Sequence, residues 1–253
     1  MVENPRMDHP NDTCTLLQTA TITVNPSALH HWPDEKEAHE FYMMIFSAQR
    51  ALNRPKYTHT FATFVKTRSQ NASSGHHLFE SHTISWLAAK KKVCLFRLWP
   101  EPGANLDLTT SLEWALSVQA RISMWGPFQI RKAFYDKALV QKARLESGAI
   151  QYKVVDAGYR PAVASSCIHG VCDIDRDRGL LWTWLRYGES ASQHIAIFFL
   201  PWMICPEQTY PWVGDRLGLS DYPIILRELP TKWLQRKAEN PLDRAPVVQV
   251  FPS

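Results

Sequence analysis

The chain has 253 residues, of which 45% are hydrophobic and 21% are charged, and it contains ten tryptophans. This balance is typical of a globular protein with a sizeable core and excludes intrinsic disorder. The formal net charge of +4 is mild, and the basic residues are dispersed apart from the triplet at 90–92, so the sequence does not indicate a nucleic-acid partner.

No Gly/Ser-rich or charged linker divides the chain, so we expect one α+β domain over residues 1–253. Within it, residues 1–20 are expected to form a flexible tail and residues 188–253 a C-terminal embellishment. The first 26 residues contain no continuous apolar segment of the kind that signal peptides carry. We therefore expect a cytoplasmic protein, or one from which an export segment has been removed.

The N-terminal part of the chain is predicted to contain one helix among several strands. Asp34 and Glu37 form a capping pair, which predicts a helix running to about Leu52. Segments rich in aromatic and β-branched residues predict the strands. These predicted strands are residues 21–24, 57–66, 79–87 and 93–99.

Helices and strands alternate in the rest of the chain. Thr110 with Glu113 predicts the cap of a short helix, and Gly148 closes a strongly amphipathic one. An extended segment is predicted to end at the Gly126–Pro127 turn. The predicted elements are helices 110–119, 132–147, 167–174, 190–199 and 212–217, and strands 121–125, 150–155 and 222–226.

Cys167 lies at the first turn of a predicted helix, where a cysteine becomes a nucleophile. Ser166 is a suitable N-cap, and Ile168, Val171 and Cys172 follow with helical spacing. The unpaired amides and the dipole of a first turn favour a thiolate, so we expect a lowered pKa if the site is partly open. The competing interpretation is a buried structural cysteine.

Two histidines upstream of Cys167 lie in predicted strands. Alternation places His59 on the face of Phe61 and His82 on the face of Ile84, so each imidazole is expected to point into an apolar layer and to need a partner. A thiol on a helix, an imidazole on a strand and a third polar group are what a cysteine protease or acyltransferase requires. Besides His82, the candidates for the third group are Asp156, Asp173 and Asn105.

His59, His82 and the segment Ser166-Cys167-Ile168-His169-Gly170 occur in an order that resembles the circularly permuted branch of the papain-like superfamily. That branch includes lecithin:retinol acyltransferase-like proteins and permuted relatives of cell-wall peptidases. Ser166 stands where the family favours Asn, and Ile168 and Gly170 replace its acidic and aromatic positions. The resemblance implies a small antiparallel sheet carrying the His strands against the Cys-bearing helix, with additional C-terminal helices.

The resemblance also implies roles for the matching residues. Cys167 would be the nucleophile, His59 the general base and His82 the orienting group; the alternative exchanges the roles of the two histidines. His169 matches the histidine of the family's motif, but it lies two residues beyond Cys167 and is expected to point away from the thiol.

Two residues are candidates for substrate binding. Trp125 precedes the Gly126–Pro127 turn, where a packed turn is expected; the alternative, an aromatic lip over a cleft, makes Trp125 a candidate substrate contact. Ser166, next to the thiol, is the second candidate.

The expected activity is that of a thiol hydrolase or acyltransferase acting on an ester or amide carbonyl of a small-molecule, lipid or peptide substrate. An acyl-lipid ester suits the Trp-rich C-terminal third, which would also allow contact with a membrane interface, whereas a peptide amide suits the wider superfamily. The alternative is a non-catalytic binding module on the same scaffold in which Cys167 is buried and inert.

We expect no cofactor and no metal. The five cysteines are scattered and lack paired C-x-x-C spacing, so reduced thiols are expected. A metal site made of His59, His82 and the pair His76-His77 is a further alternative, although no matching Cys or carboxylate spacing accompanies them.

Overall fold

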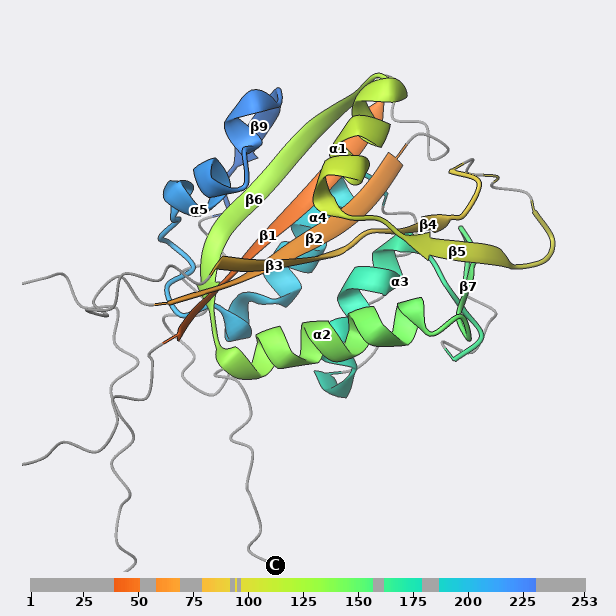
Figure 1. The fold of residues 1–253 in the computed structure, drawn as a ribbon, viewed down its shortest axis with the longest axis horizontal. Coiled ribbons are helices and arrows are strands. Elements are labelled where there is room, and N and C mark those ends of the chain that lie inside the picture. The colour runs from red at the N-terminus through yellow and green to blue at the C-terminus, as the bar shows by residue number, and fades with distance from the viewer. Residues whose placement is uncertain are drawn as a thin grey trace, which may run out of the picture. The chain divides into compact units, whose positions relative to one another are not determined.

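A five-stranded sheet organises the structure, and its strands come from both halves of the chain (Figure 1). The strand order is β3-β2-β1-β6-β9. The first four strands pair antiparallel, and β9 pairs parallel with β6 at the edge. Their bounds are β1 His39–Arg50, β2 Thr58–Arg68, β3 Phe79–Ile84, β6 Ala120–Ile130 and β9 Ile224–Arg227.

The computed structural model describes residues 39–50, 58–68, 79–91, 94, 97–156, 162–178 and 187–230, all within the compact unit Glu37–Ser253. The predicted tail at 1–20, the predicted strand at 21–24 and the His76-His77 pair lie outside the described residues.

The central strand β1 lies where the sequence predicted a helix, and that prediction is wrong. Residues Phe41–Ala48 are all buried, because β2 and β6 flank the strand and helices cover both faces of the sheet. A strand buried on both faces carries a continuous apolar run instead of an alternating pattern, and such a run resembles a buried helix segment.

Strand β6 continues through the predicted turn at Gly126–Pro127 instead of ending there. Gly126 has a φ of +95°, and a Cβ at this position would lie 2.7 Å from the carbonyl oxygen of Met43. Glycine therefore lets β6 pass close to β1 where the register between the two strands shifts.

A second, smaller sheet has the order β4-β5-β7-β8. Only Ser85 separates β4 from β3, so the single predicted strand 79–87 bends from one sheet into the other. The predicted strand 93–99 is wrong in its described residues, since β5 begins at Glu101. The bounds are β4 Trp86–Ala88, β5 Glu101–Asn105, β7 Gln151–Tyr152 and β8 Ala164–Ser165.

Five α-helices accompany the described strands, close to the predicted positions: α1 Leu108–Ser117, α2 Lys132–Glu146, α3 Cys167–Cys172, α4 Glu189–Phe198 and α5 Pro211–Arg216. The N-cap of α1 is Asp107, not Thr110, because the Asp107 carboxylate accepts a hydrogen bond of 2.7 Å from the Thr110 amide. α4 begins after Gly188, ahead of the predicted cap at Ser190.

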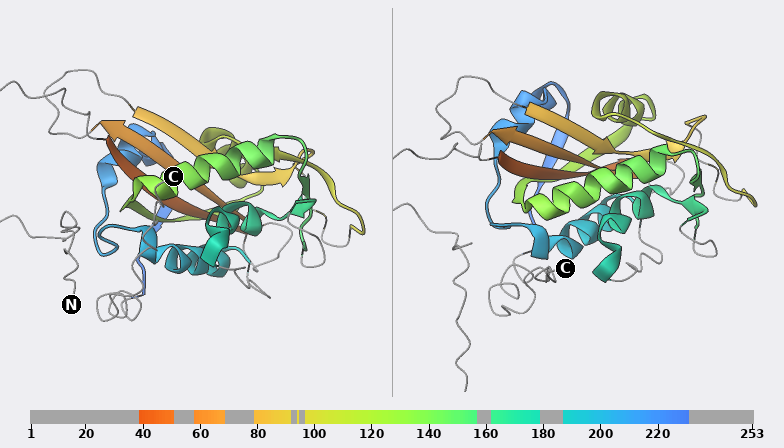
Figure 2. Two further views of the ribbon diagram at one scale, coloured as in Figure 1. Left: turned by 90° about the horizontal axis from the view of Figure 1, so that it is seen from below. Right: turned by 60° about the horizontal axis from the view of Figure 1, so that its bottom comes forward.

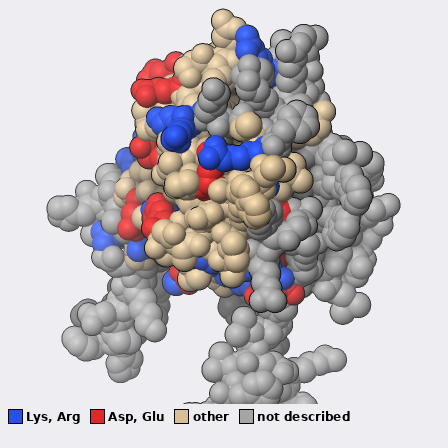
Figure 3. Space-filling model, turned by 90° about the vertical axis from the view of Figure 1, so that its right-hand side faces the viewer, with Lys and Arg blue, Asp and Glu red and all other residues tan. Residues whose placement is uncertain are grey.

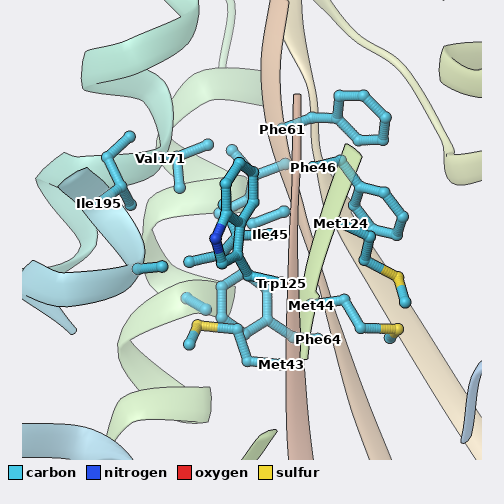
Figure 4. Close-up of a cluster of buried hydrophobic side chains, with 14 of the residues drawn as sticks. Met43, Met44, Ile45, Phe46, Phe61, Phe64, Met124, Trp125, Val171 and Ile195 are labelled. Atoms are coloured by element: carbon cyan, nitrogen blue, oxygen red, sulfur yellow. The ribbon is translucent and has the colours of Figure 1, made fainter. Parts of the chain in front are cut away.

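The helices form layers on both faces of the main sheet (Figure 2). α2, α3 and α4 cover one face, where Phe134 of α2 packs edge-on against Phe64 of β2. Val171 of α3 and Ile195 of α4 lie on that side in Figure 4, whereas Phe46 and Phe61 lie on the other. α1 and α5 cover this other face.

The fold is thus α+β, as predicted. α4 packs on β1 and β2, and β9 belongs to the main sheet, so the described part of the predicted C-terminal embellishment is integral to the fold. No described helix is both long enough and apolar enough to cross a membrane. On the side shown in Figure 3, acidic and basic residues are intermixed in the coloured area.

Candidate functional site

Cys167 is the first residue of α3, as the sequence predicted. Ser166 precedes it with an extended backbone, and its hydroxyl accepts a 3.2 Å hydrogen bond from the amide of His169. The Cys167 residue is half-buried, and its thiol is free. Backbone N–H groups of Thr60, Ile168 and Cys167 itself point toward the sulfur.

The pKa of the Cys167 thiol is nevertheless raised, to about 11, and the expectation of a lowered value is wrong. Burial of the thiol is the largest cause, and it outweighs the three backbone N–H groups that favour the thiolate. The carboxylate of Asp156 adds to the increase. The resting state is therefore a neutral thiol at neutral pH.

His59 lies near the start of β2, and its imidazole is buried on the face that α1 covers. The ring stacks on Phe61 and meets the Trp114 ring edge-on, each at a centroid distance of 5.4 Å. Its Nε2 lies 2.8 Å from the Ser85 hydroxyl, and its Nδ1 has no hydrogen-bond partner among the described residues. Burial lowers the pKa of His59 to about 3, so the ring is neutral as well.

Cys167 and His59 approach β2 from its two faces. α3 packs on the face where Thr60 bonds to Ser192 of α4, whereas His59 points to the opposite face. A backbone N–H lies in the plane of a sheet, so the Thr60 amide brings the sulfur to the edge of β2. β3 pairs with β2 only as far as Ala62, which leaves this edge unpaired by β3. The thiol thus lies beside the residue that follows His59, although no hydrogen bond joins the two side chains.

His82 does not contact His59. It lies opposite Phe64 on the face of the sheet that carries α2, where its ring is 6.1 Å from that of Tyr135 and its Nε2 is 3.6 Å from Glu80. The group on the Nε2 of His59 is Ser85 instead. The structure therefore does not bring the predicted orienting histidine to the predicted base.

Asp156 holds the start of α3. Its carboxylate accepts a 2.6 Å hydrogen bond from the Ser166 amide and lies 2.7 Å from Nδ1 of His169. These two contacts of Asp156 fix the turn that precedes Cys167. Ser166 is 4% exposed, so it is a capping residue and not an open substrate contact.

The other two candidates for a third group have separate roles. Asn105 accepts a 2.7 Å hydrogen bond from the Ser85 amide and donates to the Thr83 carbonyl, so it bridges the break between β3 and β4. Asp173, beyond the end of α3, pairs with Arg176 at 3.1 Å and with Arg144 at 3.7 Å.

Trp125 is 1% exposed and packs in the core between the sheet and the helices (Figure 4). The expectation of a packed side chain is therefore correct, and the alternative of an aromatic lip, with Trp125 as a substrate contact, is wrong. A substrate would have to displace the core to reach this ring.

Ser85 and Ser111 are site residues that the sequence analysis missed. The hydroxyl of Ser111 lies 2.7 Å from that of Ser85 and 2.6 Å from the carbonyl oxygen of Asp107, and both serines are fully buried. The available signal was Ser85 itself, a small polar residue between the apolar residues Ile84 and Trp86.

Two hollows lie near the site without including it. One of about 340 Å³ lies between Trp86 and the end of α2, and a more polar one of about 500 Å³ lies along β3 beside His82 and Lys142. Asn105 and Glu146 line both hollows. Neither contains Cys167 or His59.

The described residues contain no group of three His, Cys, Asp or Glu side chains placed to bind a metal. Cys94 and Cys172 are free thiols like Cys167, whereas Cys205 is disulfide-bonded, so the expectation of fully reduced cysteines is wrong at that position. Comparisons with protein-family models, with curated proteins and with solved structures found no match.

Proposed function

We propose that this protein is a thiol hydrolase or acyltransferase with a permuted papain-like arrangement, in which Cys167 is the nucleophile and His59 is the general base. The observation that carries the proposal is the position of the thiol. Cys167 is the first residue of α3, and its sulfur lies at the backbone amide of Thr60, the residue after His59. The Nε2 of His59 lies 2.8 Å from the Ser85 hydroxyl, and its Nδ1 has no hydrogen-bond partner in the described part of the chain.

The reaction begins from two neutral groups. The sulfur of Cys167 attacks the carbonyl carbon of an ester or amide while its proton moves to Nδ1 of His59. The C=O bond electrons go to the oxygen, and the backbone N–H groups of Cys167 and Ile168 at the start of α3 are the donors that we propose for this developing charge. The oxyanion then collapses, the leaving alcohol or amine takes the proton from His59, and a thioester remains on Cys167.

Hydrolysis and acyl transfer differ only in what attacks this thioester. Water yields a free acid, whereas an alcohol or amine acceptor yields a new ester or amide, and Cys167 recovers its proton in both cases. Because burial makes both the thiolate and the imidazolium costly, proton transfer must accompany the attack and cannot precede it as a stable ion pair.

Acylation of Cys167 tests the proposal directly. We expect native protein incubated with p-nitrophenyl esters of short and long acyl chains to gain one acyl group on Cys167, detected by intact mass and peptide mapping. His59→Ala should slow this acylation about 10²–10⁴-fold, the usual contribution of a general base. Cys94→Ala is the matched control, since Cys94 is an exposed free thiol away from α3.

The raised pKa of the thiol also favours a second function, a binding module in which Cys167 is inert. Iodoacetamide labelling between pH 5 and 9 separates the two. A Cys167 that stays unlabelled and unacylated until urea is added would reject the enzyme and favour the module. Native acylation that depends on His59 would establish the enzyme.

A further inference from the structure

Strand β3 forms an open edge of the main sheet. Among the described strands only β2 pairs with it, and it ends at Ile84, just before the break at Ser85. The residues of an edge strand turn their backbone N–H and C=O groups alternately toward the neighbouring strand and outward. The outward groups are those that could pair with a further strand.

Ser81 and Thr83 are the residues of β3 whose backbone groups point outward. The carbonyl of Thr83 accepts a 2.9 Å hydrogen bond from the side chain of Asn105, which belongs to the second sheet and not to β2. The hydroxyl of Thr83 lies 2.9 Å from that of its partner Thr63, as expected for a pair that exchanges no backbone hydrogen bonds. Because the pattern repeats at every second residue, the N–H and C=O of Ser81 lie on the same outer side.

The side chain of Asn105 already acts as one peptide group of a neighbouring strand on this edge. Its amide donates to the Thr83 carbonyl, and its oxygen accepts a 2.7 Å hydrogen bond from the Ser85 amide. A peptide group of an added strand would supply the same one donor and one acceptor. The next backbone groups along the edge are the N–H of Thr83 and both groups of Ser81, and no described residue pairs with them.

The hollow of about 500 Å³ lies along this edge. Ser81 and Thr83 line it from β3, Lys142 lines it from α2, and Leu108 and Thr109 line it from α1. The helices α1 and α2 cover opposite faces of the main sheet. A hollow that both helices border therefore lies in the plane of the sheet, which is the position that an added strand would take.

We propose that the outer edge of β3 binds an extended peptide, which pairs with Ser81 and Thr83 as an added strand and lies in this hollow. Backbone hydrogen bonds supply the affinity, as they do wherever a peptide extends a sheet. The peptide continues the row of hydrogen bonds that Asn105 begins. The inference goes beyond the proposed function and does not depend on Cys167, which does not line this hollow.

The two sides of the hollow determine which side chains the peptide should carry. Successive residues of a strand point to opposite faces, so the peptide side chains alternate between the α2 side and the α1 side. Lys142 and Glu146 make the α2 side polar, and their charges offset each other because they form a 2.7 Å ion pair. Leu108 and Leu217 lie on the other side. A peptide that alternates neutral polar and apolar β-branched residues matches both sides and favours an extended backbone.

Amide hydrogen exchange measured by NMR tests the proposal with the peptide Ac-Thr-Val-Thr-Val-Thr-NH2. In the protein alone, the amides of Ser81 and Thr83 should exchange faster than those of Glu80 and His82, which face β2. With the peptide at about ten times its dissociation constant, exchange at Ser81 and Thr83 should slow about tenfold. Equal protection of all four amides in the protein alone would show that the edge is already paired and would overturn the proposal.

Ser81→Pro removes the outward N–H and leaves the pairing of β3 with β2 in place, because proline is tolerated where the N–H of an edge strand faces outward. The variant should bind the peptide about tenfold more weakly, the factor that one neutral hydrogen bond commonly carries. Ser81→Ala keeps the N–H and is the matched control.

The same peptide methylated on its backbone nitrogens tests these hydrogen bonds without altering the protein, and it should not protect Ser81 or Thr83. Equal affinity of the methylated and unmethylated peptides, or of Ser81→Pro and the wild type, would contradict strand addition. The absence of saturable binding to the wild type would reject a peptide as the ligand of this hollow.

Discussion

His59 and Cys167 are both uncharged near neutral pH because burial disfavours the charged form of each. The first turn of a helix favours a thiolate, but that is a local effect of a few backbone dipoles. Desolvation depends on what the rest of the fold packs around the sulfur. The sequence therefore predicts the cap at Ser166 and the position of Cys167 correctly, and it cannot predict the direction of the pKa shift.

The buried His59 makes the free energy of unfolding depend on pH. The unfolded chain binds a proton at this residue below about pH 6.5, whereas the folded protein does so only near pH 3, so stability falls as the pH drops through this window. At pH 5 we expect a loss of about 2 kcal/mol relative to pH 8 from this group. Urea unfolding of wild type and His59→Gln measures it.

The stability of His59→Gln should depend less steeply on pH than that of the wild type between about pH 6.5 and pH 3. His82→Gln removes a partly exposed histidine and is expected to follow the wild type. Parallel curves for wild type and His59→Gln would contradict a neutral, buried His59.

At the scale of elements, Trp86 joins the second sheet to α3. Its indole N–H donates to the Ser165 carbonyl at 3.1 Å, and its ring and Cβ pack on two glycines. A Cβ at Gly103 would lie 2.1 Å from the Trp86 ring, and one at Gly170 would lie 3.0 Å from its Cβ. These glycines allow β5 and α3 to approach the same indole.

Gly103→Ala should therefore destabilise the protein by about 1–3 kcal/mol through overpacking. The cost should be smaller in a Trp86→Phe background, because the smaller ring leaves space for the new methyl group. Gly214→Ala is the control, since its Cβ would meet Leu219 at an ordinary 3.5 Å. Equal costs for Gly103→Ala in both backgrounds, measured by urea unfolding, would exclude the Trp86 contact as the cause.

Element types were predicted best where the signal is local. The amphipathic pattern and Gly148 predict α2, and the β-branched run predicts β2. The prediction for β1 is wrong because the strand is buried on both faces, so Met43, Met44 and Ile45 show no alternation of polarity. The bend at Ser85 depends on Asn105, a partner 20 residues away that no local pattern reveals.

For the whole molecule, the strand order explains why distant segments depend on one another. β1 is hydrogen-bonded on both edges, whereas β9 has one neighbour and exposes Leu226 at 67%. Glu189 at the start of α4 ties β9 to β6 by pairing with Arg227 at 2.6 Å and with Arg121 at 2.5 Å. This pairing of strands far apart in sequence has no local signature, so the sequence predicts the α+β class but not the sheet order.

Amide hydrogen exchange should follow the position of each strand in the main sheet. We expect the amides of β1 to exchange slowest, near the rate of global unfolding, and those of β9 to exchange first among the main-sheet strands. Glu189→Gln should speed exchange in β9 further without affecting β1. Mass-spectrometric exchange with peptides covering both strands measures this, and equal protection of β1 and β9 would contradict it.

The thiol belongs to the layer of α3, and the imidazole is held by the layer of α1 on the opposite face of β2. On the proposed function, the two groups must meet at the edge of β2 that β3 leaves unpaired. The distance from the sulfur to Nδ1 therefore reports how tightly the two layers close on the sheet. If the proposed function holds, a compound that separated α3 from β2 would move the thiol away from His59 and stop acylation of Cys167. Its contacts would be with the core residues between α3 and β2 instead of with Cys167 and His59.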